Sequence, residues 1–216
     1  MLDAAAELVQ RWGYKKTTIE DIARQADVGK GTIYLHWKTR EELFIALLLR
    51  ERLRAINEAE EHLARDPEGA SLHAAVKQST LAMLTNPLLR AAIQQDTPLW
   101  SELMRTRFVL ADTANRLAAG RLDLEHLRAQ GQVRDDESLD DQVMMLGAIS
   151  TGFMVLNSYL PEEQRLSVEA LVTLLATVVA RTFEIQASSE TPSEEKLSPF
   201  HDLFEQARAL SQKPVE

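Results

Sequence analysis

Apolar side chains recur along most of this chain with the three- and four-residue spacing of one helix face. No stretch shows the strict alternation, bounded by turn pairs, that marks a strand. Glycine and proline, which interrupt helices, number only eight and seven in 216 residues. The pattern therefore predicts an all-α fold. The expected helices span residues 2–12, 19–26, 30–37, 40–64, 71–85, 86–95, 97–130 with an interruption near Gly120, 139–157, 167–185 and 198–211.

At two expected helix starts, threonines stand three residues before acidic residues. One stretch runs from Thr17 to Asp21 and contains this spacing twice, and the other runs from Thr39 to Glu42. With this spacing, the threonine oxygen and the carboxylate can accept hydrogen bonds from the free amides at a helix start. Both stretches therefore predict helix N-termini, while Gly13 predicts the end of the first helix.

The second and third expected helices are short and are joined by a turn of three or four residues. This is the layout of a helix-turn-helix. At about 100° per residue, Ile33 and Trp37 fall on the face of the third helix that packs inward, while Gly31 and Leu35 point most directly away. Apart from Leu35, the outward arc is small, polar or basic. Such a surface suits the approach of a DNA backbone.

The segment from Gly13 to Leu43 reads G-Y-K-K-T-T-I-E-D-I-A-R-Q-A-D-V-G-K-G-T-I-Y-L-H-W-K-T-R-E-E-L. On this segment, residues 2–48 resemble the DNA-binding domain of the TetR family of transcriptional regulators. The resemblance implies that five side chains contact the DNA backbone, namely Thr18, Lys30, Tyr34, His36 and Arg40. It also implies that three residues lie nearest the bases, namely Gly31, Thr32 and Leu35.

Two positions depart from what the family often has. Gly29 stands in place of serine, which predicts a more weakly capped recognition helix. Leu35 stands in place of a polar or aromatic residue, and we expect it either to touch a thymine methyl group or simply to be exposed.

Charge is distributed unevenly along the chain. Residues 1–54 carry a formal charge of +2 and the remaining residues carry −11, which gives the net charge of −9. A basic bias at the front of an acidic chain favours a polyanion as the partner of this end. Double-stranded DNA is therefore the expected partner.

Several kinds of chemistry lack the residues they need. The chain has no cysteine, and its histidines do not have metal-ligand spacing, so we expect neither a metal nor a cofactor. It has no P-loop, no G-x-S-x-G and no H-E-x-x-H motif, so we expect no enzymatic activity. It has no signal-peptide pattern, and its longest apolar run, residues 170–180, is shorter than the roughly 18 residues of a membrane span. We therefore expect a cytoplasmic protein without a membrane partner.

The expected organisation is a DNA-binding domain over residues 1–48, an effector-binding and dimerisation domain over 49–187, and a linker with a final amphipathic helix over 188–216. Small residues one helical turn apart at 147–152 allow another helix to come close. The resemblance likewise implies a dimer bundle built from the last two core helices, and the alternative is an ordinary monomeric core. The predicted interface residues are Gly147, Ala148, Thr151, Gly152, Leu171, Leu175, Val178 and Val179.

The resemblance further implies a ligand cavity among the middle helices. Methionine and aromatic side chains there offer adaptable apolar surface for a small hydrophobic ligand, although such side chains also commonly serve as core filler. An aspartate and an asparagine could fix a polar group of the ligand, or could face solvent. The candidate ligand residues are Met83, Trp100, Met104, Phe108, Asp112, Asn115, Met145 and Phe153.

Together these features predict a homodimeric transcriptional repressor that a small molecule releases from its operator. Two alternatives remain open at this point. One is a DNA-binding protein of the same fold without a small-molecule effector. The other is a helical enzyme or carrier with a vestigial DNA-binding domain. We also expect residues 198–211 to pack on the body of the dimer.

Overall fold

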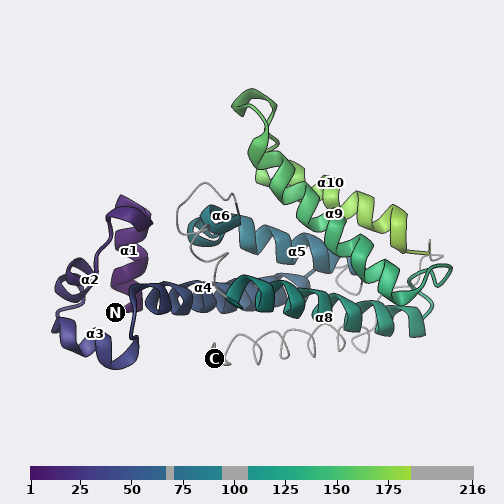
Figure 1. Ribbon diagram of the computed structural model, residues 1–216. Coiled ribbons are helices and arrows are strands. Elements are labelled where there is room, and N and C mark those ends of the chain that lie inside the picture. The colour runs from purple at the N-terminus through teal and green to yellow at the C-terminus, as the bar shows by residue number, and fades with distance from the viewer. Residues whose placement is uncertain (67–70, 94–106, 186–216) are drawn as a thin grey trace.

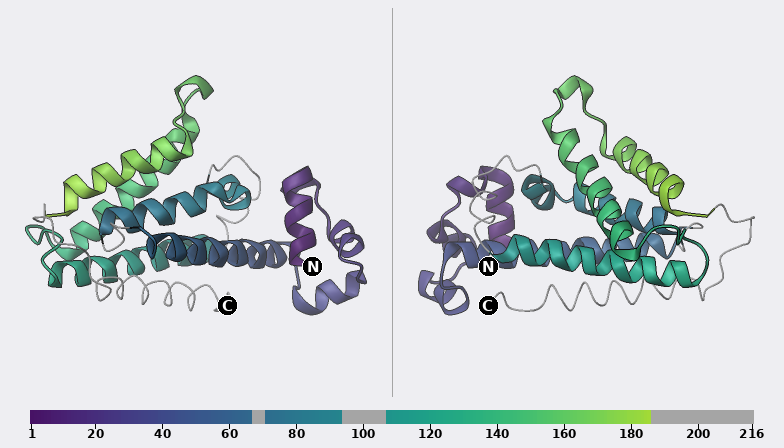
Figure 2. Two further views of the ribbon diagram at one scale, coloured as in Figure 1. Left: turned by 180° about the vertical axis from the view of Figure 1, so that it is seen from behind. Right: turned by 45° about the vertical axis from the view of Figure 1, so that its right-hand side comes forward.

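The computed structural model describes residues 1–66, 71–93 and 107–185, excluding the side chains of residues 93, 107–116 and 119. The predicted linker and final helix lie outside these residues. The described chain is all-α, as expected, with a small three-helix head at one end of a long helix and a larger helical body along the rest of it (Figures 1 and 2).

The head contains α1 (Leu2–Trp12), the short 3-10 helix η1 (Tyr14–Lys16), α2 (Ile19–Gln25) and α3 (Lys30–His36). Gly13 ends α1 with φ 78°, a left-handed conformation that glycine adopts without steric cost. The core of the head is completed by the first turns of the helix that begins at Arg40. The fully or almost fully buried side chains are Ala5, Ile22, Ile33, Leu43 and Phe44.

The body begins with α4 (Arg40–Leu63), which packs against α5 (Leu72–Thr85) and α6 (Pro87–Ile93). The predicted starts are confirmed, because the side chains of Thr39 and Ser71 accept hydrogen bonds from the third amides of their helices. The predicted boundary between residues 48 and 49 falls inside continuous α4. The same helix therefore contributes to both the head and the body.

The body is completed by α8 (Arg107–Ala129), α9 (Leu139–Tyr159), η2 (Glu162–Gln164) and α10 (Val168–Phe183). The interruption predicted near Gly120 is wrong, because α8 continues through it. A single glycine weakens a helix by only about 1 kcal/mol, which tertiary packing readily offsets. α10 packs on α5, and α8 packs on α9. The α9–α10 hairpin extends beyond the other helices at its tip (Figures 1 and 2).

Asp123 on α8 is buried, and its Oδ1 has no hydrogen-bond partner among the described residues. Burial raises the pKa of this carboxyl well above its usual range, because desolvation penalises the charged form. Between the ordinary pKa of 3.8 and the raised value, the native state binds more protons than the unfolded state. The free energy of unfolding therefore falls as the pH rises through this window.

We expect Asp123→Asn to remove this fall, since asparagine carries no ionisable group. Urea unfolding at about pH 5 and about pH 8 should show a smaller difference between the two pH values in the variant than in the wild type. Asp135→Asn, at an exposed position, is the matched control and should leave the difference unchanged. An unchanged difference in Asp123→Asn would show that Asp123 is not the titrating group.

Candidate nucleic-acid interface

The turn between α2 and α3 is built by the sequence Ala26 to Gly29. Asp27 adopts φ 52°, which places it in the left-handed region that aspartate tolerates better than most side chains. The amide of Val28 donates to the Ala23 carbonyl at 3.0 Å, and the amide of Asp27 donates to that of Arg24 at 3.3 Å. These two bonds close α2 in a Schellman motif and set the direction in which α3 leaves.

The recognition helix α3 buries Ile33 fully and exposes most of its other side chains. Ile33 belongs to the hydrophobic core, and Trp37 packs partly against the same core. Leu35 is 77% exposed, and a Cβ added at Gly31 would meet nothing within 4 Å. The outward face predicted from the sequence is therefore confirmed as geometry. A groove wall can approach the backbone closely at Gly31.

Lys30 and Tyr34 lie together on the exposed surface of α3. Lys30 forms an ion pair with Glu20 of α2, and its Nζ lies 5.8 Å from the Tyr34 ring centroid. The hydrogen bond between the two charged groups lowers the pKa of Glu20 and raises that of Lys30. Both side chains are about half exposed, so water and salt screen the attraction between Lys30 and Glu20. Lys30 can therefore exchange the Glu20 carboxylate for a DNA phosphate.

Arg40 is placed differently from the other predicted backbone contacts. Its Nε donates to the Thr17 carbonyl at 3.2 Å, its Nη2 donates to the Tyr14 carbonyl, and its guanidinium lies 4.0 Å from the Tyr14 ring centroid. The side chain is only partly exposed. It holds η1 against the start of α4, so its principal observed contacts are inside the head.

The remaining predicted contacts differ in their exposure and in their hydrogen bonds. Thr18 caps α2 in a full capping box with Asp21, so its hydroxyl is already bonded. His36 is exposed at the end of α3, and Thr32 is half-buried near its start. Gly29 caps α3 without any side-chain hydrogen bond, as its lack of a side chain predicts.

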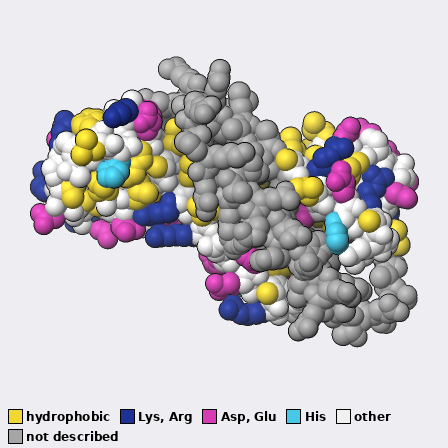
Figure 3. All heavy atoms as spheres, turned by 90° about the horizontal axis from the view of Figure 1, so that it is seen from below, with side chains coloured by type: hydrophobic (Ala, Val, Ile, Leu, Met, Phe, Trp, Pro, Cys, Tyr) yellow, Lys and Arg dark blue, Asp and Glu magenta, His cyan; other side chains and the backbone are white. Residues whose placement is uncertain are grey.

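Three exposed lysines that the sequence interpretation did not single out also lie in the head: Lys15, Lys16 and Lys38. Lys15 and Lys16 occupy η1, and Lys38 separates α3 from α4. Figure 3 shows Lys and Arg side chains around the rim of the head, with Asp and Glu side chains between them. The position of these three lysines beside the short helices is the sequence signal that makes them candidate phosphate contacts.

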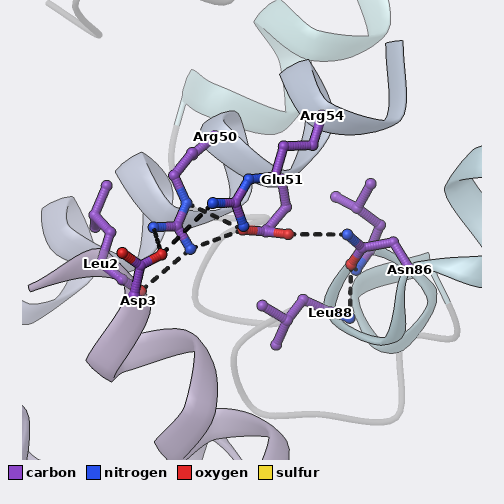
Figure 4. Close-up of polar contacts among 8 residues, drawn as sticks. Leu2, Asp3, Arg50, Glu51, Arg54, Asn86 and Leu88 are labelled. Atoms are coloured by element: carbon purple, nitrogen blue, oxygen red, sulfur yellow. Dashed lines mark hydrogen bonds and ion pairs between the residues drawn. The ribbon is translucent and has the colours of Figure 1, made fainter. Parts of the chain in front are cut away.

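A polar network joins the head to the body (Figure 4). Glu51 on α4 is buried, with its side chain 7% exposed, and its Oε1 accepts hydrogen bonds from Arg50 and Arg54 at 2.8 to 3.0 Å. Arg50 Nη1 also donates to Asp3 on α1 at 2.7 Å. On the other side, Asn86 Nδ2 donates to Glu51 Oε2 at 3.0 Å.

Asn86 completes the connection to α6. Its Oδ1 accepts hydrogen bonds from the amides of Leu88 and Leu89 at 3.0 and 3.2 Å, so it caps α6 while it bonds Glu51. The chain of contacts therefore runs from α1 through α4 to the start of α6. We call the four charged side chains and Asn86 the junction network.

The predicted ligand residues are only partly described. Trp100 and Met104 lie outside the described residues, as do the side chains of Phe108, Asp112 and Asn115. Met83 and Phe153 are half-buried, and Met145 lies at the surface. The ligand site therefore stays a prediction.

The predicted dimer residues divide into two groups. Leu171, Leu175 and Val179 are buried in the chain's own core, where α10 packs on α5, and Val178 is half-buried. A Cβ at Gly147 would lie 2.9 Å from Leu117, so this glycine serves the close approach of α8 and α9. A second group is exposed on α9: Ala148, Thr151 and Gly152.

The exposed side of the α9–α10 hairpin is markedly apolar. Leu156 is 63% exposed and Tyr159 is 68% exposed near its tip, and Met144 and Leu174 are also exposed. By length and composition alone, α9 is long and apolar enough to cross a membrane, which is weak evidence for a span on its own. A large exposed apolar surface of this kind marks a site that another surface covers.

Comparison with known proteins relates both parts of the chain to regulators. Residues 1–47 match the family described as "Bacterial regulatory proteins, tetR family". The fatty acid metabolism regulator protein of Bacillus subtilis (strain 168) is 27% identical over 124 residues, which cover 57% of this chain and 61% of that protein. The HTH-type transcriptional repressor KstR of Mycolicibacterium smegmatis is 28% identical over 155 residues, which cover 69% of each.

The similarity in fold extends over most of the chain. A complex of SmeT with triclosan matches with a TM-score of 0.63 and 21% identity, and the match covers 89% of this chain and 93% of that one. SmeT is described as the repressor of a multidrug efflux pump of Stenotrophomonas maltophilia. The sequence matches are shorter than the structural ones. The chain spans about three fifths of the length of the fatty acid regulator that it matches.

Proposed function

This chain belongs to the TetR family of bacterial regulatory proteins, and from that premise we propose that it is a homodimeric transcriptional repressor released from its operator by a small molecule. The family is one of DNA-binding regulators and not of enzymes. We expect a cytoplasmic protein, because its proposed partner is DNA.

The observation that carries this proposal is the outward face of α3. A helix of seven residues that buries Ile33 and turns Gly31, Tyr34 and Leu35 to solvent has a shape that can enter a major groove. Lys30, Tyr34 and His36 then lie at the edges, where phosphates run. Lys15, Lys16 and Lys38 add positive charge beside them, while Arg40 positions η1.

A second copy of the chain is the proposed cover for the α9–α10 hairpin. One recognition helix contacts few phosphates, whereas a two-fold dimer places two helices in successive major grooves about 34–36 Å apart. The proposed interface combines the exposed residues predicted from the sequence with exposed apolar side chains that the structure adds. These residues are Met144, Ala148, Thr151, Gly152, Leu156, Tyr159 and Leu174.

The proposed effector is a small, largely apolar molecule held in the body. Support comes from the names of a relative and of a structural neighbour, which refer to fatty acid metabolism and to a complex with triclosan. Met83, Phe153 and Met145 remain candidate contacts, together with the candidates outside the described side chains. The effector shifts the operator equilibrium only if it binds the DNA-incompetent arrangement of the heads more tightly.

The experiment that tests the proposal is a fluorescence anisotropy titration on an operator selected from random duplexes, at several salt concentrations. We expect Lys30→Ala to weaken binding and to reduce the salt slope by about two, because a symmetric dimer loses two phosphate contacts. Glu20→Gln is the matched opposite change. It frees Lys30 from its ion pair and removes a negative charge, so it should strengthen binding.

The two variants differ from the wild type at exposed positions, so neither should unfold the head. A salt slope that stays at the wild-type value in Lys30→Ala would show that Lys30 does not contact a phosphate. If the wild type selected no sequence, the proposed function would be refuted.

A further inference from the structure

A pocket of about 400 Å³ lies where the head meets the body. One wall comes from α1 and the residues that follow it, the second from α4, and the third from α6. This volume falls within the range of about 300–1,000 Å³ that small-molecule sites occupy. Its lining includes Val9, Gln10, Tyr14, Phe44, Leu88 and Ala91. We call it the junction pocket.

The chemistry of the walls indicates what the junction pocket could hold. Among the residues that the structure describes, no Lys, Arg, Asp or Glu side chain lines it, and most of its lining is aliphatic or aromatic. Gln10 supplies one amide side chain that can both donate and accept a hydrogen bond. A charged ligand would lose its hydration there without a counter-charge, whereas an uncharged apolar molecule with one polar group would not.

The position of the junction pocket connects it with the orientation of the head. Val9 belongs to α1, which is part of the head, and Leu88 belongs to α6, which is part of the body. The amide of Leu88 is bonded to Asn86, so this wall is also tied into the junction network. A molecule in the pocket therefore contacts both sides of the joint about which the head would turn.

We propose that the junction pocket is a binding site for an uncharged, apolar small molecule that lowers operator affinity by changing the angle between α1 and α6. The regulatory part of this inference rests on the proposed function, whereas binding to the pocket does not. The bound molecule acts by binding one orientation of the head more tightly than the other. The largest change in operator affinity that it can cause is set by the difference between these two affinities.

The test uses 1-aminoanthracene, an uncharged aromatic fluorophore, titrated into the full chain without DNA. We expect saturable binding to the wild type and at least tenfold weaker binding to Ala91→Phe, whose larger side chain fills the pocket from an exposed position on α6. Gln10→Phe fills the pocket from α1 and should have the same effect, which guards against misfolding of one variant. Ala129→Phe, at an exposed position on α8, is the matched control and should bind like the wild type.

A second arm measures operator affinity. Ala91→Phe mimics an occupied pocket and should bind the operator about fivefold or more weakly than Ala129→Phe. Equal probe binding by all variants, or no binding by the wild type, would overturn the site. Probe binding that is lost in both filling variants while their operator affinity is unchanged would overturn its coupling to DNA. A wild type that binds the probe but no DNA would instead refute the proposed function.

Discussion

Replacing Leu156 with glutamate is expected to convert the dimer into monomers and to lower operator affinity by about 10²–10⁴-fold. Leu156 is exposed in the single chain, so the substitution should not disturb the chain's own core. In the proposed dimer the same position is covered, and a carboxylate would be buried there without a partner. Loss of the dimer removes the simultaneous engagement of two half-sites, which is the source of the large effect.

Sedimentation velocity gives the mass of the variant, and anisotropy gives its operator affinity. Ala64→Glu introduces the same charge at an exposed position after α4, and we expect it to remain dimeric with wild-type affinity. Circular dichroism should show equal helix content in both variants. A dimeric Leu156→Glu that retains its operator affinity would exclude the tip of the α9–α10 hairpin from the interface.

Glu51→Ala is expected to lower the free energy of unfolding by about 2–4 kcal/mol. Removal of one partner of an isolated buried ion pair costs about 3–5 kcal/mol, because the other charge is left without a partner. We place the value lower because Arg50 and Arg54 keep Asp3 as a partner, and because Arg54 is more than half exposed to water. Asn86 loses the partner that holds it in place, so the cap of α6 should weaken as well.

Urea unfolding measures this loss, with Glu58→Ala as the control. Glu58 is exposed on the same helix, and its replacement should change the free energy of unfolding by less than about 0.5 kcal/mol. Glu51→Gln keeps an acceptor for one arginine, so its free energy of unfolding should lie between those of Glu51→Ala and Glu58→Ala. A Glu51→Ala variant as stable as Glu58→Ala would show that the junction network contributes little to stability.

The elements of the fold followed from local signals in the sequence. Thr18 and Thr39 start α2 and α4 because their side chains satisfy free amides, and those signals depend only on neighbours in the chain. The burial of Ile33 and the exposure of Leu35 likewise follow from helical periodicity. The left-handed conformation of Asp27 was harder to predict, because the left-handed residue after a helix is usually glycine.

Features that depend on distant parts of the chain could not be predicted in this way. Arg40 bonds carbonyls more than twenty residues earlier in the chain, which no local pattern indicates, and its expected contact with the DNA backbone stays a prediction. Leu175 and Val179 were expected to meet a partner because their helix is apolar nearly all round, but α5 already covers them. Periodicity reveals that a face is buried, and it does not reveal what buries it.

Two copies of α3 are proposed to read two successive major grooves. Selection of bound sequences from random duplexes by the full chain, at moderate salt, is the decisive measurement. We expect an enriched inverted repeat whose half-sites are centred about one helical turn, or a multiple of it, apart, and whose enrichment is lost with Leu156→Glu. Enrichment of a single unrepeated site, or of no sequence at all, would contradict it.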